Sequence, residues 1–342
     1  MEQDLEWQKS QHSYSIVQIF LLIQMDALTE ILKSVQLHST VHCRSEFSAP
    51  WGIQMAAMAD ASFHVVMRGH CWLEVEGVDN PIPLVGGDLV VLPTGVAHAL
   101  RDRPDSPLVT LADLLSHRPC QGQLTLSYGG GGTGATVLCG KASFENREIN
   151  PLLSALPPLL LIQGEEGRAV EWLDSTLQFI ACETASNRPG AEMMITYLSN
   201  IVFIQAIRAY LSSLKPDDSS WLRGLIDPQI SLALALIHHQ PEATWTVENL
   251  AKRVNMSRSG FAARFKWLMG EAPLQYVTRW RMVRAVELLR SHNLTVGEVA
   301  ERVGYDSETA FSKAFKRQMG QPPNQYRKQL EFNRSDHNFA GN

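Results

Sequence analysis

Two stretches in the last third of the chain are written alike, fifty residues apart. They read Phe261-Ala-Ala-Arg-Phe-Lys-Trp-Leu-Met-Gly-Glu-Ala-Pro-Leu-Gln-Tyr276 and Phe311-Ser-Lys-Ala-Phe-Lys-Arg-Gln-Met-Gly-Gln-Pro-Pro-Asn-Gln-Tyr326, with eight of sixteen aligned positions identical. A repeat of this length, built from helical sequence, indicates one supersecondary unit used twice. The repeat therefore decides the fold of this region, and the rest of the chain is interpreted outward from it.

Copy one predicts a helix, a short turn and a second helix. Thr246, with Asn249 three positions later, opens a short helix that reaches Val254. Ser257 opens a second helix, and Gly270 ends it. A helix followed by a short turn and a second helix is the geometry that presents the second helix to the major groove of DNA.

Copy two repeats this pattern, with helices predicted over 296–303 and 307–319 and Gly320 as the end of the second. In both copies, two phenylalanines four positions apart are expected to face a small core. The outward positions are basic. They are Arg258, Arg264 and Lys266 in copy one and Lys313, Lys316 and Arg317 in copy two.

A continuous helix over 274–290 joins the two copies. Its roughly 17 residues make a strut about 25 Å long. One turn of DNA is about 34 Å. We therefore expect the strut to hold the two second helices over successive major grooves on one face of the DNA.

Residues 228–330 resemble the DNA-binding domain of the AraC/XylS family of transcriptional regulators, which carries two helix-turn-helix motifs. Each copy has the Gly-x-x-Pro-x-x-Tyr sequence expected in that family, at Gly270, Pro273 and Tyr276 and at Gly320, Pro323 and Tyr326. The resemblance implies a sequence-specific regulator rather than an enzyme. Its implied partners are double-stranded promoter or operator DNA, RNA polymerase and a second copy of the chain.

Within this resemblance, residues near the start of each second helix are predicted to contact base edges. They are Arg258, Ser259, Ala262 and Arg264 in copy one, and Ser307, Glu308, Thr309, Ser312 and Lys313 in copy two. Residues further along each helix, namely Lys266, Lys316 and Arg317, are predicted to hold phosphates instead. The alternative for any one of these residues is a solvated surface position without a role in binding. Because the two copies present different side chains, the DNA site is expected to be asymmetric.

The charge of the chain is unevenly distributed. Residues 1–240 contain 14 Lys and Arg against 25 Asp and Glu, a net charge of -11, whereas residues 241–342 contain 16 against 10, a net charge of +6. This division indicates that only the C-terminal part meets a polyanion. The overall composition, with 45% hydrophobic and 19% charged residues, is typical of a globular protein.

The cysteines and the N-terminus both favour a cytoplasmic protein. The five cysteines are odd in number and lack CxxC spacing, which argues for a reducing compartment. The apolar stretch over 16–25 is shorter than the roughly 20 residues that cross a bilayer, and acidic residues precede it instead of a basic signal region. We expect residues 1–24 to be an extension and Asp26 to cap the first helix.

Residues 41–145 contain short β-type runs broken by glycine and proline, which predicts an antiparallel sandwich or barrel. In the run over 72–76, alternation places Leu73 and Val75 inward and the two glutamates outward. The glycine-rich segment 129–134 is interpreted as a hairpin loop. It is not a phosphate-binding loop, because no Lys-Ser or Lys-Thr pair follows it.

Two amphipathic helices follow, over 170–180 and 191–214. The second is apolar over much of its circumference and must be covered. Either the first helix and the barrel cover it, or a second copy of the chain does so in a dimer. The polar residues 215–220 are then interpreted as a linker.

The segment Gly87-Asp-Leu-Val-Val-Leu-Pro-Thr-Gly-Val-Ala-His98 resembles the second motif of the cupins, which is Gly, five residues, Pro-x-Gly, two residues and His. The first motif is degenerate. His64 is present, but Val66 stands where the second histidine belongs, and no glutamate falls at the family spacing. The resemblance implies a cupin-like barrel that senses an effector and dimerises, with a poor case for a metal.

Cys43, His64, His98 and Cys139 are the effector or redox candidates, because all four are expected on strands of one barrel. They are ordinary core residues, thiols that an oxidant links, or contacts to a small ligand or a soft metal such as Zn²⁺. His64 and His98 are weak metal candidates, and no cofactor is expected. Cys71 and Cys182 are predicted to be buried structural thiols.

The sequence thus predicts an α+β chain with an ordered set of segments. They are an extension (1–24), a cupin-like sensor barrel (25–156), a helical pair (157–214), a linker (215–227), a double helix-turn-helix domain (228–331) and a tail (332–342). The predicted function is a transcription regulator that senses a small effector or an oxidant. The alternatives are a cupin metalloenzyme or metal-dependent sensor with a DNA-binding tail, and an architectural DNA binder without sensing. No nucleophile–base pair stands out in the sequence.

Overall fold

The computed structural model describes residues 26–35, 37–117, 125–144, 151–164, 171–186, 188–215, 220–290 and 294–330. The chain divides into two compact units. The sheet unit contains the described residues of 37–144 and 153–215, and the helical unit contains those of 26–35, 151–152 and 220–330.

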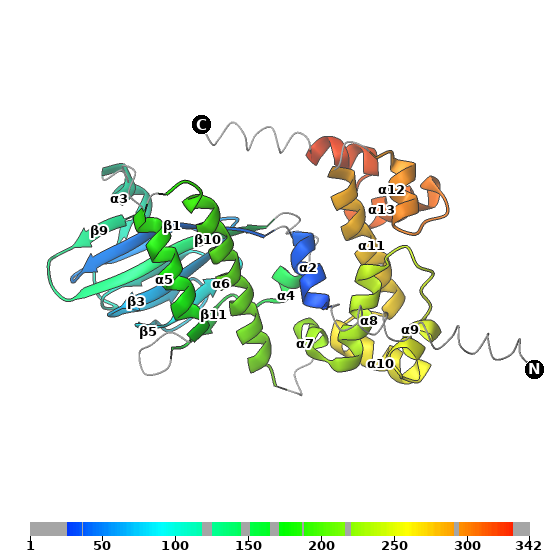
Figure 1. Cartoon of the computed structure of the whole chain (residues 1–342), viewed down its shortest axis with the longest axis horizontal. Coiled ribbons are helices and arrows are strands. Elements are labelled where there is room, and N and C mark those ends of the chain that lie inside the picture. The colour runs from blue at the N-terminus through cyan, green and yellow to red at the C-terminus, as the bar shows by residue number, and fades with distance from the viewer. Residues whose placement is uncertain are drawn as a thin grey trace, which may run out of the picture. The chain divides into compact units, whose positions relative to one another are not determined.

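The sheet unit contains two hydrogen-bonded sheets rather than one closed barrel (Figure 1). The larger sheet has the order β11 (Leu160–Ile162), β6 (Leu89–Leu92), β3 (Ala61–Arg68), β10 (Gly134–Phe144), β1 (Leu37–Ser48) and β9 (Thr125–Gly129). The smaller sheet has the order β5 (Ile82–Val85), β4 (His70–Val75), β7 (His98–Arg101), β2 (Gly52–Met55) and β8 (Val109–Thr110). The two-sheet arrangement is consistent with the predicted cupin-like fold.

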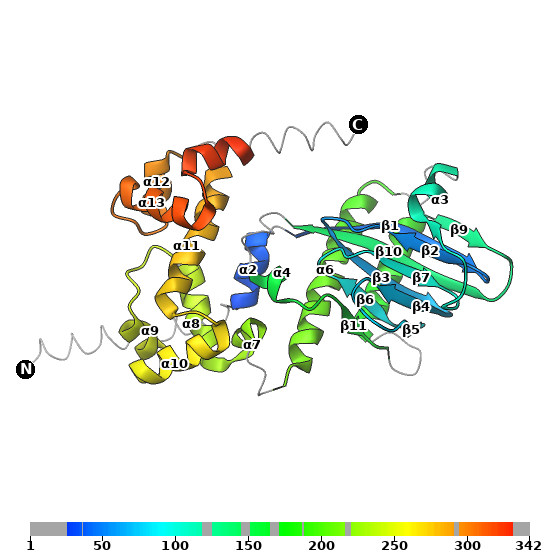
Figure 2. The same ribbon diagram turned by 180° about the vertical axis from the view of Figure 1, so that it is seen from behind.

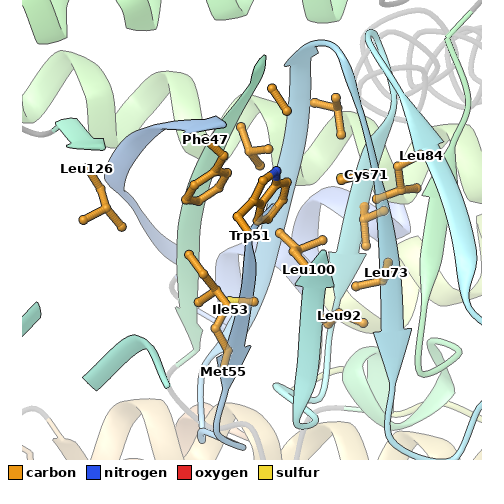
Figure 3. Close-up of a cluster of buried hydrophobic side chains, with 14 of the residues drawn as sticks. Phe47, Trp51, Ile53, Met55, Cys71, Leu73, Leu84, Leu92, Leu100 and Leu126 are labelled. Atoms are coloured by element: carbon orange, nitrogen blue, oxygen red, sulfur yellow. The ribbon is translucent and has the colours of Figure 1, made fainter. Parts of the chain in front are cut away.

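The core of the sheet unit draws side chains from both sheets (Figure 3). Leu73 and Val75 of β4 are buried, as their alternation predicts. The ring of Phe47 stacks on that of Trp51, with centroids 4.2 Å apart and planes 20° apart. Burial of such large apolar side chains between the sheets is the main stabilising contribution in this unit.

The predicted hairpin over 129–134 is wrong. β9 and β10 are not neighbours, because β1 lies between them, parallel to β9 and antiparallel to β10. The glycines instead allow the backbone of this loop to approach the backbone of β1 closely. Gly130 donates its N–H to the carbonyl of Ser48 at 2.8 Å, and a Cβ added to Gly129 would lie 1.8 Å from the same oxygen. The glycine-rich sequence therefore lets the loop pass tightly over the end of β1.

Four helices follow or interrupt the strands. They are α3 (Leu111–His117), α4 (Pro151–Ala155), α5 (Glu171–Ser186) and α6 (Ala191–Ser213). Figure 1 shows α5 and α6 over the outer face of the larger sheet. Asn200 of α6 accepts a hydrogen bond from the N–H of Ser39 on β1 at 2.8 Å. The two predicted amphipathic helices are confirmed. The predicted burial of Cys182 is wrong, because this residue lies on the solvent side of α5.

Helix α6 is covered on one side only. Val202 and Phe203 are buried, while Met194, Tyr197 and Ile201 are exposed. By length and composition alone α6 could also cross a membrane, although 39% of its most apolar window is buried. The first of the two predicted covers, namely α5 and the sheet, is therefore present, and it leaves an apolar stripe uncovered.

The helical unit contains the repeated sequence. Its helices are α2 (Ala27–Val35), α7 (Trp221–Ile226), α8 (Pro228–His239), α9 (Val247–Arg253), α10 (Arg258–Met269), α11 (Pro273–Arg290), α12 (Val296–Arg302) and α13 (Glu308–Met319). The predicted linker over 215–227 thus contains a helix, α7, which Ser220 caps through the N–H of Arg223. Figure 2 shows α11 running from the group of α8, α9 and α10 to the group of α12 and α13.

Helix α2 belongs to the helical unit, although the sequence placed it with the barrel. Asp26 caps it as predicted, by accepting the N–H of Leu28 at 3.0 Å. Ala27, Leu28 and Ile31 are buried, and α2 packs against α8. A single residue, at position 36, separates α2 from β1 of the sheet unit.

Candidate nucleic-acid interface and sensor cavity

The first helix of each repeat begins with the same device. In copy one, Thr246 accepts the N–H of Asn249 at 3.1 Å, and Asn249 accepts the N–H of Thr246 at 2.9 Å. In copy two, Thr295 and Glu298 make the same reciprocal pair at 3.2 and 2.7 Å. Each pair is a capping box, which satisfies two backbone donors that would otherwise lack a partner at the start of the helix.

The second helices, α10 and α13, are the candidate recognition helices. The side chains of Ser257 and Ser307 each accept a backbone N–H three residues on, at 3.2 Å. Both helices end at a glycine in the left-handed region, with φ of 75° at Gly270 and 77° at Gly320. The predicted ends of both helices and the start of α10 are confirmed, whereas α13 begins one residue later than predicted, at Glu308.

An aromatic triplet packs beneath each recognition helix. Phe261 lies 5.6 Å from Phe265, which meets Tyr276 edge-on at 5.6 Å. The same arrangement recurs in copy two at 5.5 and 5.5 Å, with Phe311, Phe315 and Tyr326. All four phenylalanines are fully buried. The shared Gly-x-x-Pro-x-x-Tyr sequence thus places a tyrosine where it closes the phenylalanine pair.

The turn between the helices uses a left-handed residue in both copies. Copy one has Asn255 at φ 56° and copy two has Gly304 at φ 81°. A Cβ on Gly304 would lie 2.7 Å from both the carbonyl of Glu242 and the guanidinium of Arg281. The turn of copy two therefore requires glycine for its space as well as for its backbone conformation.

Arg281 of α11 joins this turn to a distant loop. Its guanidinium donates to three backbone carbonyls, those of Pro241 at 2.7 Å, Ala243 at 3.0 Å and Gly304 at 3.0 Å. One arginine of the strut therefore ties the turn of copy two to the loop that precedes copy one.

The strut, α11, contributes buried side chains to the packing of both copies. Met282 and Val286 pack in the core of copy two. Toward its other end, Trp280 stacks on His238 of α8 at 3.7 Å, and Tyr276 shares a 2.7 Å hydrogen bond with His238. Its 18 residues give a length of about 27 Å. The predicted strut is confirmed, and packing on both copies holds it in place.

Most of the predicted DNA contacts lie on the surface of the helical unit. The exposed ones are Arg258, Ser259, Arg264 and Lys266 in copy one and Ser307, Glu308, Thr309, Lys313, Lys316 and Arg317 in copy two. Ala262 and Ser312 are half-buried. All of these assignments remain predictions.

Arg264 has a structural partner that the sequence did not reveal. Its Nε and Nη2 donate to Oδ2 of Asp227 at 3.0 and 2.5 Å. Asp227 also caps α8, because its Oδ1 accepts the N–H groups of Gln229 and Ile230. Burial acts to raise the pKa of Asp227, but the bonds from Arg264 and the two amides outweigh it and lower that pKa. Arg264 therefore links α10 to the start of α8.

The sheet unit contains a cavity of about 520 Å³. It is lined by Ser45, Phe47, Ile53, Met55, Met58, Ser62, His64, His98, Leu100, Leu111, Leu115, Leu126, Cys139, Gly140 and Lys141. His64 and His98 are 2% and 4% exposed, whereas Met58 and Leu115 are 41% and 39% exposed. The histidines thus belong to the buried part of the cavity wall, and Met58 and Leu115 belong to its exposed part. Its volume is typical of a small-molecule site.

Three of the four effector candidates meet in one chain of hydrogen bonds. Cys139 Sγ lies 3.3 Å from His64 Nδ1, His64 Nε2 lies 2.8 Å from His98 Nε2, and His98 Nδ1 lies 2.8 Å from the carbonyl of Val96. The structure therefore brings both histidines and this cysteine into one interior. Cys43 stands opposite Cys139 in the register of β1 and β10, and its side chain lies outside the described residues.

The donor and acceptor roles in this chain of hydrogen bonds follow from its last acceptor, the carbonyl of Val96. A carbonyl only accepts, so His98 Nδ1 carries a hydrogen and His98 Nε2 does not. His64 then donates from Nε2, and its Nδ1 accepts the S–H of Cys139. Burial favours the neutral form of both rings, because it lowers the pKa of His98 and lowers that of His64 well below 6.5, where His98 adds to the effect.

A metal does not fit these donors. A metal needs lone pairs that converge on one point, whereas Cys139 and His98 contact opposite nitrogens of the His64 ring. In the part of the chain that the structure describes, no group of three or more His, Cys, Asp or Glu side chains is placed to hold a metal ion. The degenerate first cupin motif is consistent with this geometry, since Val66 is buried in the apolar core.

Sequence reasoning missed the apolar wall of the cavity. It named polar residues but not the apolar ones, which look like ordinary inward strand positions. They are Phe47, Ile53, Met55, Leu100 and Leu126. One signal was available in α3, where Leu111 and Leu115 are four positions apart and both line the cavity.

Comparison with known proteins supports both halves of this description. A model of the Cupin family matches residues 26–212, and a model of the Helix-turn-helix domain family matches residues 250–329. The HTH-type transcriptional regulator AlkR of Acinetobacter baylyi is 34% identical over 310 residues, which cover 89% of this chain and 100% of AlkR. A putative AraC-like transcription regulator of Streptomyces lividans is 34% identical over 307 residues, covering 89% of this chain and 98% of that protein.

Among solved structures, the DNA-binding domain of AdpA in complex with a target DNA is 38% identical and has a TM-score of 0.30. The match covers 32% of this chain and 97% of that one. The fold and the two matched family models define a class, the cupin-containing helix-turn-helix proteins. Within that class, this chain belongs to the AraC-like family of transcriptional regulators.

Proposed function

We propose that this regulator senses a small-molecule effector in the cavity of its sheet unit and that the bound effector changes transcription at its operators. The carrying observation is the cavity of about 520 Å³ in a chain that also contains the double helix-turn-helix domain. A protein that binds DNA only to shape it does not require a cavity for a small molecule. We further propose that the protein acts in the cytoplasm, where it binds promoter DNA and contacts RNA polymerase.

The active form is proposed to be a homodimer. The exposed apolar stripe of Met194, Tyr197 and Ile201 on α6 supports this proposal. Single exposed apolar side chains are ordinary, but a row of them along one helix face is typical of a binding surface. A second copy of the chain is the partner that is present in every cell that makes the protein.

The sensing proposal is tested with two substitutions on α3. Leu111 lines the cavity, whereas Ala112 is exposed and does not. Leu111→Trp should fill the cavity, and Ala112→Trp adds the same ring on the outside as the matched control. Operators are first located by genome-wide footprinting, and a reporter is then placed under one of them.

We expect the reporter to become insensitive to growth conditions with Leu111→Trp, because the effector no longer fits. With Ala112→Trp the reporter should respond as it does with the wild type. Both variants should still occupy the operator in a gel-shift assay. A normal response from both variants would contradict the proposal.

Oxidant sensing is the second candidate, and one observation favours it. Cys43 and Cys139 are cross-strand partners in an antiparallel pair, where Cα atoms lie about 4.5–5.5 Å apart, within the range that a disulfide needs. The test is mild oxidation of the full chain, trapping of free thiols and mapping of disulfides. A Cys43–Cys139 link that alters DNA binding supports this candidate. Unchanged DNA binding with no such link rules it out.

A further inference from the structure

The polar groups of the cavity wall are already engaged with the protein itself. Six lining side chains carry polar groups, namely Ser45, Ser62, His64, His98, Cys139 and Lys141. A ligand can bond to them only if they retain donors or acceptors that the protein does not use. The state of each one therefore determines which ligands the cavity can hold.

The two histidines and the cysteine satisfy one another. Cys139 donates to His64, His64 donates to His98, and His98 donates to the carbonyl of Val96. Each N–H and S–H hydrogen in this chain has an acceptor, and each bare ring nitrogen has a donor. These hydrogen-bonded side chains thus offer a ligand neither an N–H donor nor a ring-nitrogen acceptor.

The remaining polar groups also have partners within the protein, although these partners do not use every donor and acceptor. The ammonium of Lys141 lies 3.4 Å from the carboxylate of Asp60, so this cation is already paired. The hydroxyl of Ser62 donates to the sulfur of Met58 at 3.6 Å, and Ser45 also has an interaction within the protein. The rest of the wall is aliphatic and aromatic apart from the thioethers of two methionines and the backbone of one glycine.

From this wall we infer that the effector is an uncharged, hydrocarbon-like molecule, held by apolar contact and not by hydrogen bonds or ion pairs. A carboxylate in the cavity would lose hydration without meeting an unneutralised cation, because Asp60 already neutralises Lys141, and this is unfavourable. A hydrocarbon gains from leaving water and requires no partner. This inference rests on the proposed sensing function and specifies its ligand class.

The test compares matched probes on the full-length protein. Each pair has a similar apolar body with or without a carboxylate: n-decane against decanoate, and n-butylbenzene against 4-butylbenzoate. Binding is measured as displacement of the uncharged dye Nile red, followed by fluorescence. We expect each hydrocarbon to bind about ten-fold more tightly than its carboxylate. A carboxylate that binds as tightly as its hydrocarbon overturns the inference.

A substitution in the chain of hydrogen bonds tests its cause. Cys139→Ala leaves His64 Nδ1 without its S–H donor, so an alcohol can donate there. The affinity of 1-decanol relative to n-decane should then rise about five-fold. Cys71→Ala is the control, because Cys71 is a buried thiol of the same unit that does not line the cavity. An unchanged ratio in folded Cys139→Ala protein overturns the inference, and the wild-type comparison decides it if this variant does not fold.

The failure of this inference is distinguishable from the failure of the proposed function. If a carboxylate binds and Leu111→Trp abolishes the reporter response, the cavity senses a ligand of another class. If no probe displaces Nile red and Leu111→Trp responds as the wild type does, the sensing function itself is wrong.

Discussion

The two helix-turn-helix copies have the same local structure but different tertiary contacts. Both have a capping box, a serine cap, a glycine end and an aromatic triplet, with ring centroids 5.6 Å apart in copy one and 5.5 Å apart in copy two. Copy one is additionally fastened to α8, through the ion pair of Arg264 with Asp227 and the stack of Trp280 on His238. Copy two is connected to the loop before α9 through Arg281.

A repeated sequence therefore forms the same local structure twice, but the two copies make different tertiary contacts. Arg264 and Ala314 occupy the same position of the repeat, yet only the arginine can bind the carboxylate of Asp227. Copy one thus uses one predicted base reader to fasten two helices together, although this arginine is itself exposed, and copy two has an alanine at the same position. The two recognition helices therefore present different surfaces, in keeping with the expectation that the protein reads an asymmetric site.

The largest expected effect tests whether the aromatic cores of the two copies contribute equally to stability. Phe265→Ala and Phe315→Ala each remove a fully buried ring that contacts a phenylalanine and a tyrosine. Each should lower the free energy of unfolding by about 3–5 kcal/mol, because loss of a buried aromatic leaves a cavity. Urea denaturation of the full chain measures the cost. Costs that differ by more than about 2 kcal/mol would show that the two cores are not equivalent.

The next effect lies in the turns, where the copies differ. Gly304→Ala should destabilise the protein by about 1–3 kcal/mol, since a Cβ there is strained and meets Arg281 and Glu242. Asn255→Gly should cost less than about 1 kcal/mol, because the position already lies in the left-handed region that glycine adopts freely. Thermal unfolding of both variants is the measurement. Equal costs would mean that close packing at Gly304 does not distinguish the turns.

A smaller effect separates base reading from helix fastening within copy one. Arg258→Ala should relax sequence preference by about 1–3 kcal/mol at one base position if it reads a base edge. Arg264→Ala should instead lower stability by about 1–2 kcal/mol, because it leaves the carboxylate of Asp227 without its cation. Binding to a panel of operator variants, beside urea denaturation, gives both quantities. Loss of base preference with unchanged stability in Arg264→Ala would reverse its assignment.

The smallest effect concerns phosphate contacts, for which Lys266 and Lys316 occupy matching positions. Each substitution to alanine should weaken binding to every sequence alike and reduce the salt slope by about one charge. Titration of DNA binding against salt concentration tests this. Lys252→Ala is the control, because Lys252 lies on α9 outside the recognition helices and pairs there with Glu248. A slope that does not change for Lys316→Ala would leave it as a solvated surface residue.

Local features were predictable because their causes are local. A serine or threonine cap, a glycine end and phenylalanines four positions apart act over single turns of helix, so the sequence located α9, α10, α12 and α13. The placement of His64 and His98 on strands of one unit was also expected, from the resemblance to the cupin motifs, but their hydrogen bond was not. The hairpin over 129–134 failed, because glycine spacing does not encode which distant strand lies between two others.

The sequence by itself determined the doubled helix-turn-helix, its strut and the cupin-like sheets, since these depend on periodicity, caps and motif spacing. Only the tertiary structure decided that α2 packs with the helical unit, that Arg264 binds Asp227, and that Cys139, His64 and His98 bond to one another in the cavity wall. These outcomes depend on which groups meet after the chain has folded, and residues far apart in sequence carry no local signal of that meeting.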